Sequence, residues 1–225
     1  MNKAARVYVA GVILSGIAIL SFAVSHWQTD DPNRFAVFLL LFLAAGTLKC
    51  VVPGVAGTYS PVFFFALLGS TTLSLSEVVT ASAMAAIVQT IYKPKFKPTL
   101  LKVSFNAANL VVSTACAFVF IRRTIPAMTN QSALMGMIVG AAVFYVVNSG
   151  LVATALSLVE HRSLAGVWKH WCFGSLPYYM VGVMITGASN PVVQAVALVA
   201  VPAIIGATIY FRYMPQSDCS KWVSE

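Results

Sequence analysis

Four residues in one apolar stretch carry hydrogen-bonding or polarizable side chains at helical spacing. They are Asn106, Asn109, Ser113 and Cys116, separated by three, four and three positions. Residues three or four apart lie on one side of a helix, so the spacing predicts a polar face on a helix over 103–122. A buried amide on such a face either joins a neighbouring helix or contacts a bound small molecule.

Two later apolar stretches, 132–159 and 168–188, supply candidate partners for that face. These are Tyr145, Asn148, Ser175, Tyr178 and Tyr179. At about 1.5 Å per residue, Asn109, Asn148 and Tyr178 lie roughly 10 to 17 Å from the same end of their helices, so we expect them to meet at one depth. Two interpretations stay open: hydrogen bonds that only hold helices together, and a small polar pocket for a ligand.

The stretch "LKCVVPGVAGTYSP" interrupts an otherwise apolar region. Its proline and glycines, followed by polar residues, favour a tight turn between two helices. The alternative is an unwound segment that lines a binding site at membrane depth. The candidate residues are Pro53, Gly54, Gly57, Thr58 and Ser60.

Glu77 is the only acidic residue between Asp31 and Glu160. A lone carboxylate within an apolar region is a candidate proton or cation site. However, Ser74-x-x-Glu77 is the pattern of a capping box, in which both side chains bond to the first turn of a helix. We favour the helix cap.

Residue patterns for catalysis or metal binding are absent from the sequence. It has no nucleophile elbow, phosphate-binding loop or HExxH motif, and its four cysteines show no CxxC spacing. We therefore expect no catalytic residue, no metal site, no cofactor and no enzymatic activity.

The composition indicates that the candidate site residues lie on membrane helices. The chain has 225 residues, of which 59% are hydrophobic and 9% are charged, too little polar surface for a soluble protein of this size. We predict an all-α polytopic bundle over residues 1–212 with a short cytoplasmic tail, 213–225. Its apolar segments, of which about six to eight would truly span, are 5–26, 34–52, 58–73, 75–93, 103–122, 132–159, 168–188 and 190–212. The segment 58–73 is short and either spans or re-enters the membrane.

The distribution of lysine and arginine predicts the orientation. With both termini cytoplasmic, all of the 14 lysines and arginines except Arg34, Arg122 and Arg123 fall inside. The proline-containing loop Lys93–Lys102 then faces anionic lipid headgroups of a bacterial inner (plasma) membrane. The chain has 14 basic and 6 acidic residues, and this topology explains the excess of basic residues. We therefore expect no nucleic acid partner. Gly136-x-x-x-Gly140 predicts close helix packing, within the bundle or in a homodimer.

The order of several motifs resembles a known family. The runs "LKCVVPGVAGTYSPVFFFALLGS", "LSEVVTASAMAAIVQTIY", "SFNAANLVVSTA" and "VVNSGLVATALSL" resemble the amino-terminal membrane module of bacterial cyclic-di-nucleotide signalling proteins of the HD phosphodiesterase and GGDEF types. The resemblance covers roughly residues 35–185 and implies a sensory or anchoring module whose last helix feeds a cytoplasmic output domain. By position it implicates Pro53, Gly54, Gly57, Thr58, Ser60, Phe105, Asn106, Asn109 and Asn148.

Three functions follow as hypotheses. The first is a membrane sensor that binds a small or amphipathic ligand between the helices over 103–122, 132–159 and 168–188 and relays binding through the last helix. The second is a small-molecule transporter or the substrate-binding subunit of a vitamin importer. The third is an inert membrane scaffold.

Overall fold

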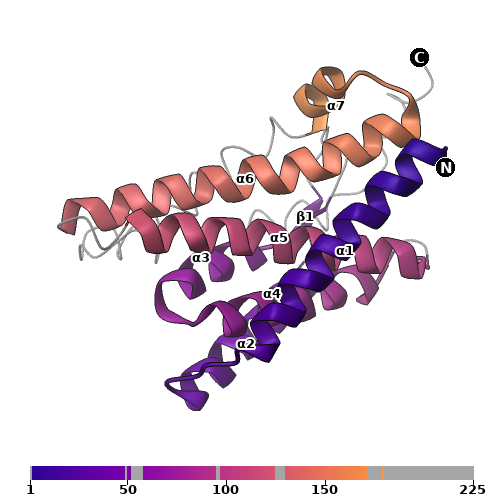
Figure 1. The fold of residues 1–225 in the computed structure, drawn as a ribbon. Coiled ribbons are helices and arrows are strands. Elements are labelled where there is room, and N and C mark those ends of the chain that lie inside the picture. Colours follow the sequence, from indigo (N-terminus) through magenta and orange to yellow (C-terminus); the bar gives the residue numbers. More distant parts are fainter. Residues whose placement is uncertain are drawn as a thin grey trace.

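Helices make up almost all of the part of the chain that the structure describes. The computed structural model describes residues 2–48, 50–51, 58–94, 97–124, 130–171 and 179. The elements in order are α1 (Lys3–Ser25), α2 (Pro32–Thr47), β1 (Cys50–Val51), β2 (Thr58–Tyr59), α3 (Val62–Thr72), α4 (Leu75–Ile91), α5 (Leu100–Thr124), α6 (Asn130–Glu160) and α7 (Leu164–Trp171) (Figure 1). The predicted helical architecture is confirmed for these residues, apart from the short strands β1 and β2. The predicted helix over 190–212 and the tail 213–225 lie outside them.

A short antiparallel ladder replaces helix on both sides of the Pro-Gly stretch. Cys50 pairs with Tyr59 and Val51 with Thr58. The predicted helix over 34–52 is therefore too long, because α2 ends at Thr47 and the chain becomes extended at Leu48. The predicted helix over 58–73 likewise begins late, at Val62. The chain reverses through a hairpin here, and a hairpin needs extended residues on each side of its turn.

Three described helices are long and apolar enough to cross a membrane. They are Lys3–Ser25, Leu100–Arg123 and Met135–Glu160, which supports a membrane protein. The helices α2, α3 and α4 are apolar but shorter. With 11 residues, α3 is only about 16 Å long, against roughly 30 Å for a bilayer core. Its length fits a half-span rather than a crossing.

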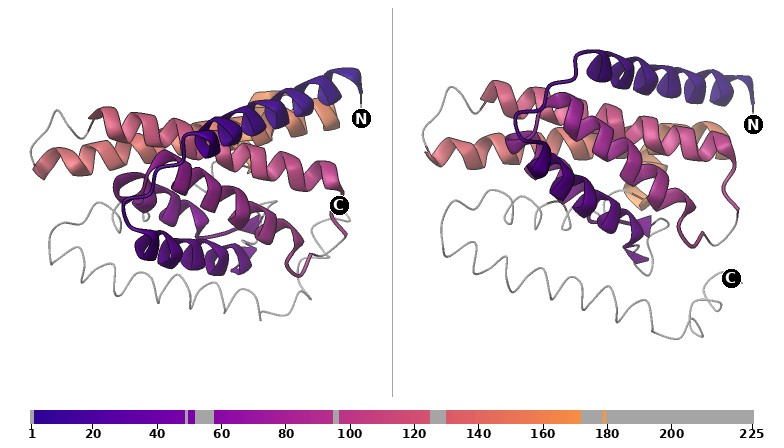
Figure 2. Two further views of the ribbon diagram at one scale, coloured as in Figure 1. Left: turned by 60° about the horizontal axis from the view of Figure 1, so that its bottom comes forward. Right: turned by 90° about the horizontal axis from the view of Figure 1, so that it is seen from below.

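The helix α5 occupies the centre of the bundle. It contacts α1, α3, α4 and α6, and both views of Figure 2 show α5 and α6 running side by side. The two helices are antiparallel, because Asn109 contacts Asn148 while Ile121, later in α5, packs at Gly140, earlier in α6. Contacts with α5 or α6 therefore show at which end of the bundle each other element lies.

Hydrogen bonds show which helix termini share an end of the bundle. At one end, Asn2 Nδ2 donates to the carbonyl of Leu158 over 3.1 Å, which joins the start of α1 to the last turns of α6. At the other end, Arg122 Nη2 donates to the carbonyl of Leu73 over 2.9 Å, which joins the last turns of α5 to the α3–α4 junction. Ser74 Oγ in turn donates to the carbonyl of Gln28 after α1.

Glycines let helices approach closely inside the bundle. A Cβ atom on Gly16 of α1 would lie 2.5 Å from Ala108 Cα of α5, so this crossing depends on the missing side chain. On α6, a Cβ on Gly140 would collide with Ile121 of α5. The predicted close-packing face at Gly140 therefore packs within the bundle.

Candidate functional site

The predicted polar face of α5 is shared between two neighbouring helices. Asn106 Nδ2 donates to Thr90 Oγ1 of α4 over 3.1 Å. Asn109 Nδ2 donates to Asn148 Oδ1 of α6 over 2.6 Å. Ser113 is buried and its hydroxyl donates to the carbonyl of Asn109 in the same helix over 2.7 Å. Of this face, only Asn109 reaches the predicted partner Asn148.

Asn148 extends the contact to a third segment. Its Nδ2 donates to the hydroxyl oxygen of Tyr179 over 3.2 Å, and Tyr179 is buried. Asn109, Asn148 and Tyr179 thus form a continuous hydrogen-bonded chain, which we call the Asn–Asn–Tyr chain. The sequence predicted that these segments meet, with Tyr178 as the third member. Ser175 and Tyr178 lie outside the described residues, and the observed third member is Tyr179.

The Asn–Asn–Tyr chain lies at the middle depth of the bundle. Asn109 is nine residues from the start of α5 and Asn148 is twelve residues from the end of α6, or about 14 and 18 Å along the two axes. Neither α5 between 103 and 121 nor α6 between 131 and 159 contains a Lys, Arg, His, Asp or Glu. The chain is therefore a neutral polar site inside apolar surroundings.

One atom of the Asn–Asn–Tyr chain has no hydrogen-bond partner. Asn109 is 5% exposed, and its Oδ1 is a buried acceptor without a donor among the described residues. A buried polar atom without a hydrogen bond costs roughly 1–3 kcal/mol, so such atoms are rare and mark places where water or a ligand donor is expected.

Aromatic rings surround the Tyr179 end of this chain. The Tyr179 ring centroid is 4.5 Å from that of Phe63, 5.0 Å from that of Tyr145 and 6.1 Å from that of Phe144. Phe63 and Phe144 are buried. Ring separations of this size are typical of favourable aromatic pairs. Together with the Asn–Asn–Tyr chain, these rings form what we call the polar–aromatic cluster.

Phe63 shows that α3 begins inside the bundle. It lies in the first turn of α3, and its ring is 6.3 Å from that of Phe144. Phe144 is fourteen residues from the start of α6 and sixteen from its end. The start of α3 is therefore near the middle of α6.

The other predicted residues of the Pro-Gly stretch are only partly described. Pro53, Gly54 and Gly57 lie outside the described residues. Thr58 forms β2 with Tyr59. Ser60 is buried and its hydroxyl donates to the carbonyl of Ala45 over 2.7 Å, which ties the start of α3 to α2.

Ser74 and Glu77 form the expected capping box at the start of α4. Ser74 Oγ accepts from Glu77 N, and Glu77 Oε2 accepts from Ser74 N over 2.8 Å. The carboxylate also accepts from Thr29 Oγ1 over 2.5 Å and is 1% exposed. Besides capping α4, Glu77 therefore joins the α1–α2 connection to α4 through this hydrogen bond.

Sequence reasoning missed three residues of the site region. Thr90 pairs with Asn106, and Phe63 and Phe144 supply rings around Tyr179. The aromatic run Phe63-Phe64-Phe65, two residues after Pro61, was the available signal for Phe63. Thr90 and Phe144 belong to no motif or polar spacing in the sequence that would have singled them out.

The described residues contain no group of His, Cys, Asp and Glu that could hold a metal ion. The sequence matches no protein-family model, and neither a curated protein nor a solved structure matches it. The function is therefore inferred from the geometry of the polar–aromatic cluster.

Proposed function

We propose that this protein is a membrane-embedded small-molecule-binding module that acts as a sensor without enzymatic activity. The observation that carries the proposal is the buried, unpartnered Asn109 Oδ1 at the head of the Asn–Asn–Tyr chain. A bound molecule that donates a hydrogen bond to this oxygen removes the free-energy cost of a buried acceptor without a donor. If the Asn–Asn–Tyr chain served only to hold the helices together, that cost would remain.

The surroundings of Asn109 define the class of ligand. No charged residue occurs in α3 (Val62–Thr72) or in the central parts of α5 and α6, so a charged molecule would enter without a counter-ion at high cost. The rings of Phe63, Phe144 and Tyr179 suit a flat apolar body. The proposed ligand is therefore neutral, largely aromatic or apolar, and carries at least one N–H or O–H donor.

Signalling needs a ligand that binds two arrangements of the bundle with different affinity. Tyr179 follows α7 in the chain and contacts Asn148 and Phe63, so a ligand beside Asn109 would act on the segment that leads toward the carboxyl terminus. This route supports a relay to an output domain on the cytoplasmic side of a bacterial plasma membrane.

Indole and 1-methylindole test the proposal, because they differ mainly in the N–H donor. We expect indole to raise the unfolding temperature of the full chain in detergent more than 1-methylindole does. A single hydrogen bond predicts an affinity difference of about three- to ten-fold. The Asn109→Leu variant should lose the difference between the two compounds.

Asn106→Leu is the matched control for this experiment. It removes an asparagine one turn earlier on α5 that bonds to Thr90 instead of Asn148, so the preference for indole should survive. Equal responses to both compounds in the wild-type chain, or loss of the preference in both variants, would reject the proposed site.

A second candidate function is a transporter or the substrate-binding subunit of an importer. The observation that favours it is the start of α3 near the middle of α6, beside Phe63 and Phe144, because interrupted helices that begin at mid-depth line the substrate sites of many transporters. Uptake of radiolabelled indole into proteoliposomes that contain the protein would distinguish transport from sensing.

A further inference from the structure

The two ends of the bundle differ in charge. The end that holds the start of α1, the α4–α5 connection and the α6–α7 corner is called the basic end. Its described side chains include the cations Lys3, Arg6, Lys93, Lys97, Lys102 and Arg162 and one carboxylate, Glu160. The opposite end has Arg34, Arg122 and Arg123 balanced by Asp30, Asp31 and Glu77.

Contacts along α5 place these cations at one end. Arg122 bonds to Leu73 at the opposite end, so Lys102, in the first turn of α5, lies at the basic end. Because α5 and α6 are antiparallel, Lys102 lies at the level of the last turns of α6. Asn2 bonds to Leu158 in those turns, which brings Lys3 to the same end.

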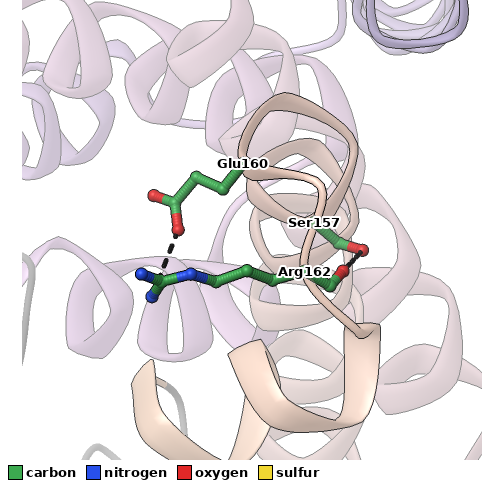
Figure 3. A network of polar contacts seen from close by, with 3 residues as sticks. All are labelled: Ser157, Glu160 and Arg162. Carbon is green, nitrogen blue, oxygen red and sulfur yellow. Dashed lines mark hydrogen bonds and ion pairs between the residues drawn. The ribbon is translucent and has the colours of Figure 1, made fainter.

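The cations of the basic end are exposed and form few ion pairs within the protein. All six are exposed, and only Arg162 forms an ion pair among the described residues, with Glu160 at 3.6 Å (Figure 3). Three charged residues of the opposite end, Arg122, Asp31 and Glu77, are instead engaged within the protein. Arg122 donates to the carbonyl of Leu73, the Asp31 carboxylate accepts from Asn33 N and Arg34 N, and Glu77 is buried.

The helix α7 adds apolar surface at the basic end. The chain turns sharply at His161, which has φ 57, and Ser157 Oγ donates to the carbonyl of Arg162 over 2.6 Å (Figure 3). Val167 is then buried against Ala153 of α6, while Leu164 stays 45% exposed. A short helix with an exposed leucine beside outward-facing cations matches the headgroup layer of a membrane.

We propose that the basic end binds anionic phospholipid headgroups, and that it faces the leaflet richer in them. The proposal depends on the charge asymmetry and not on the polar–aromatic cluster. A phosphate diester headgroup offers the negative charge and the acceptor oxygens that exposed lysines and arginines attract. The acyl chains of the same lipid would lie against the exposed apolar faces of the helices, which free phosphate cannot do.

Native mass spectrometry of the full chain in detergent tests this proposal, with phosphatidylglycerol and phosphatidylcholine as probes. We expect phosphatidylglycerol to be retained in preference. Lys102→Gln should reduce its retention about five-fold, because one cation near an anionic surface contributes that much attraction. Raising the salt concentration to about 0.5 M should weaken the preference through screening.

Arg123→Gln is the matched control, since Arg123 is exposed in the last turn of the same helix and should retain phosphatidylglycerol like the wild-type chain. Lys97→Gln, in the connection between helices, provides a second variant if Lys102→Gln folds poorly. Equal retention of the two lipids, or equal losses in the lysine variants and Arg123→Gln, would overturn the proposal.

Discussion

The amide of Asn109 donates to Asn148 on the neighbouring helix while its own oxygen, buried in the same bundle, accepts from no described residue. One side chain thus holds two helices together and presents an open acceptor. The two roles can be separated, because the helix contact needs both asparagines and the acceptor belongs to Asn109 alone.

Removing only one of the paired amides should cost more stability than removing both. Asn148→Leu leaves Asn109 with two buried polar atoms and no partner, so we expect a loss of about 1–3 kcal/mol. The double variant Asn109→Leu/Asn148→Leu buries no orphan amide and should lie within about 1 kcal/mol of wild type. Denaturant unfolding in detergent measures both values. Additive losses would show that the two amides do not interact.

The close crossing of α1 and α5 should make two glycines of α1 behave differently. Gly16→Ala places a methyl group against the Ala108 backbone, and we expect a loss of about 1–3 kcal/mol from overpacking. A Cβ on Gly11 meets nothing within 4 Å, so Gly11→Ala should be neutral or slightly stabilising. Thermal unfolding of the two variants provides the comparison. Similar melting temperatures would argue against this crossing.

Glu77 should matter more than an ordinary helix cap. Glu77→Ala removes the bond from Ser74 N and the bond from Thr29 Oγ1, and we expect a loss of about 2–3 kcal/mol. Thr29→Val removes only the second bond and should cost about 1 kcal/mol. Unfolding temperatures and protease cleavage within residues 26–31 report the effect. If Glu77→Ala costs no more than Thr29→Val, the cap contributes nothing.

The neighbouring arginines at the end of α5 should have unequal effects. Arg122 donates to the carbonyl of Leu73 and lies 5.3 Å from the Phe118 ring centroid. Arg122→Gln should therefore destabilise by about 1–2 kcal/mol. Arg123→Gln should be within about 0.5 kcal/mol of wild type, as expected for an exposed side chain. Chemical unfolding distinguishes the two, and equal effects would contradict the assigned contact.

Local patterns were sufficient to predict several parts of this fold. The capping box at Ser74 and Glu77 is present because both partners lie within one turn, and tertiary packing does not need to be known. The long apolar runs around α1, α5 and α6 gave helices of membrane-spanning length for the same reason. The end of α2 at Thr47 was missed, since the hairpin that ends it requires pairing between residues seven and nine positions apart.

The site was predicted less completely, for geometric reasons. Asn106 and Asn109 are three residues apart, which rotates them by about 60° around the helix axis. One therefore faces Thr90 of α4 and the other Asn148 of α6, a division that only the positions of the neighbouring helices decide. Phe63 reaches Tyr179 because α3 starts near the middle of α6, and nothing in the apolar run at the start of α3 encodes that depth.

The central claim is that a ligand donor bonds to Asn109 Oδ1. Carbon-13 NMR of asparagine side-chain carbonyls in the detergent-solubilised chain measures this directly, with the Asn109 signal assigned by its absence in Asn109→Leu. We predict that indole shifts the Asn109 carbonyl signal and that 1-methylindole leaves it in place. An Asn109 signal that ignores both compounds, or moves equally with each, would contradict the claim.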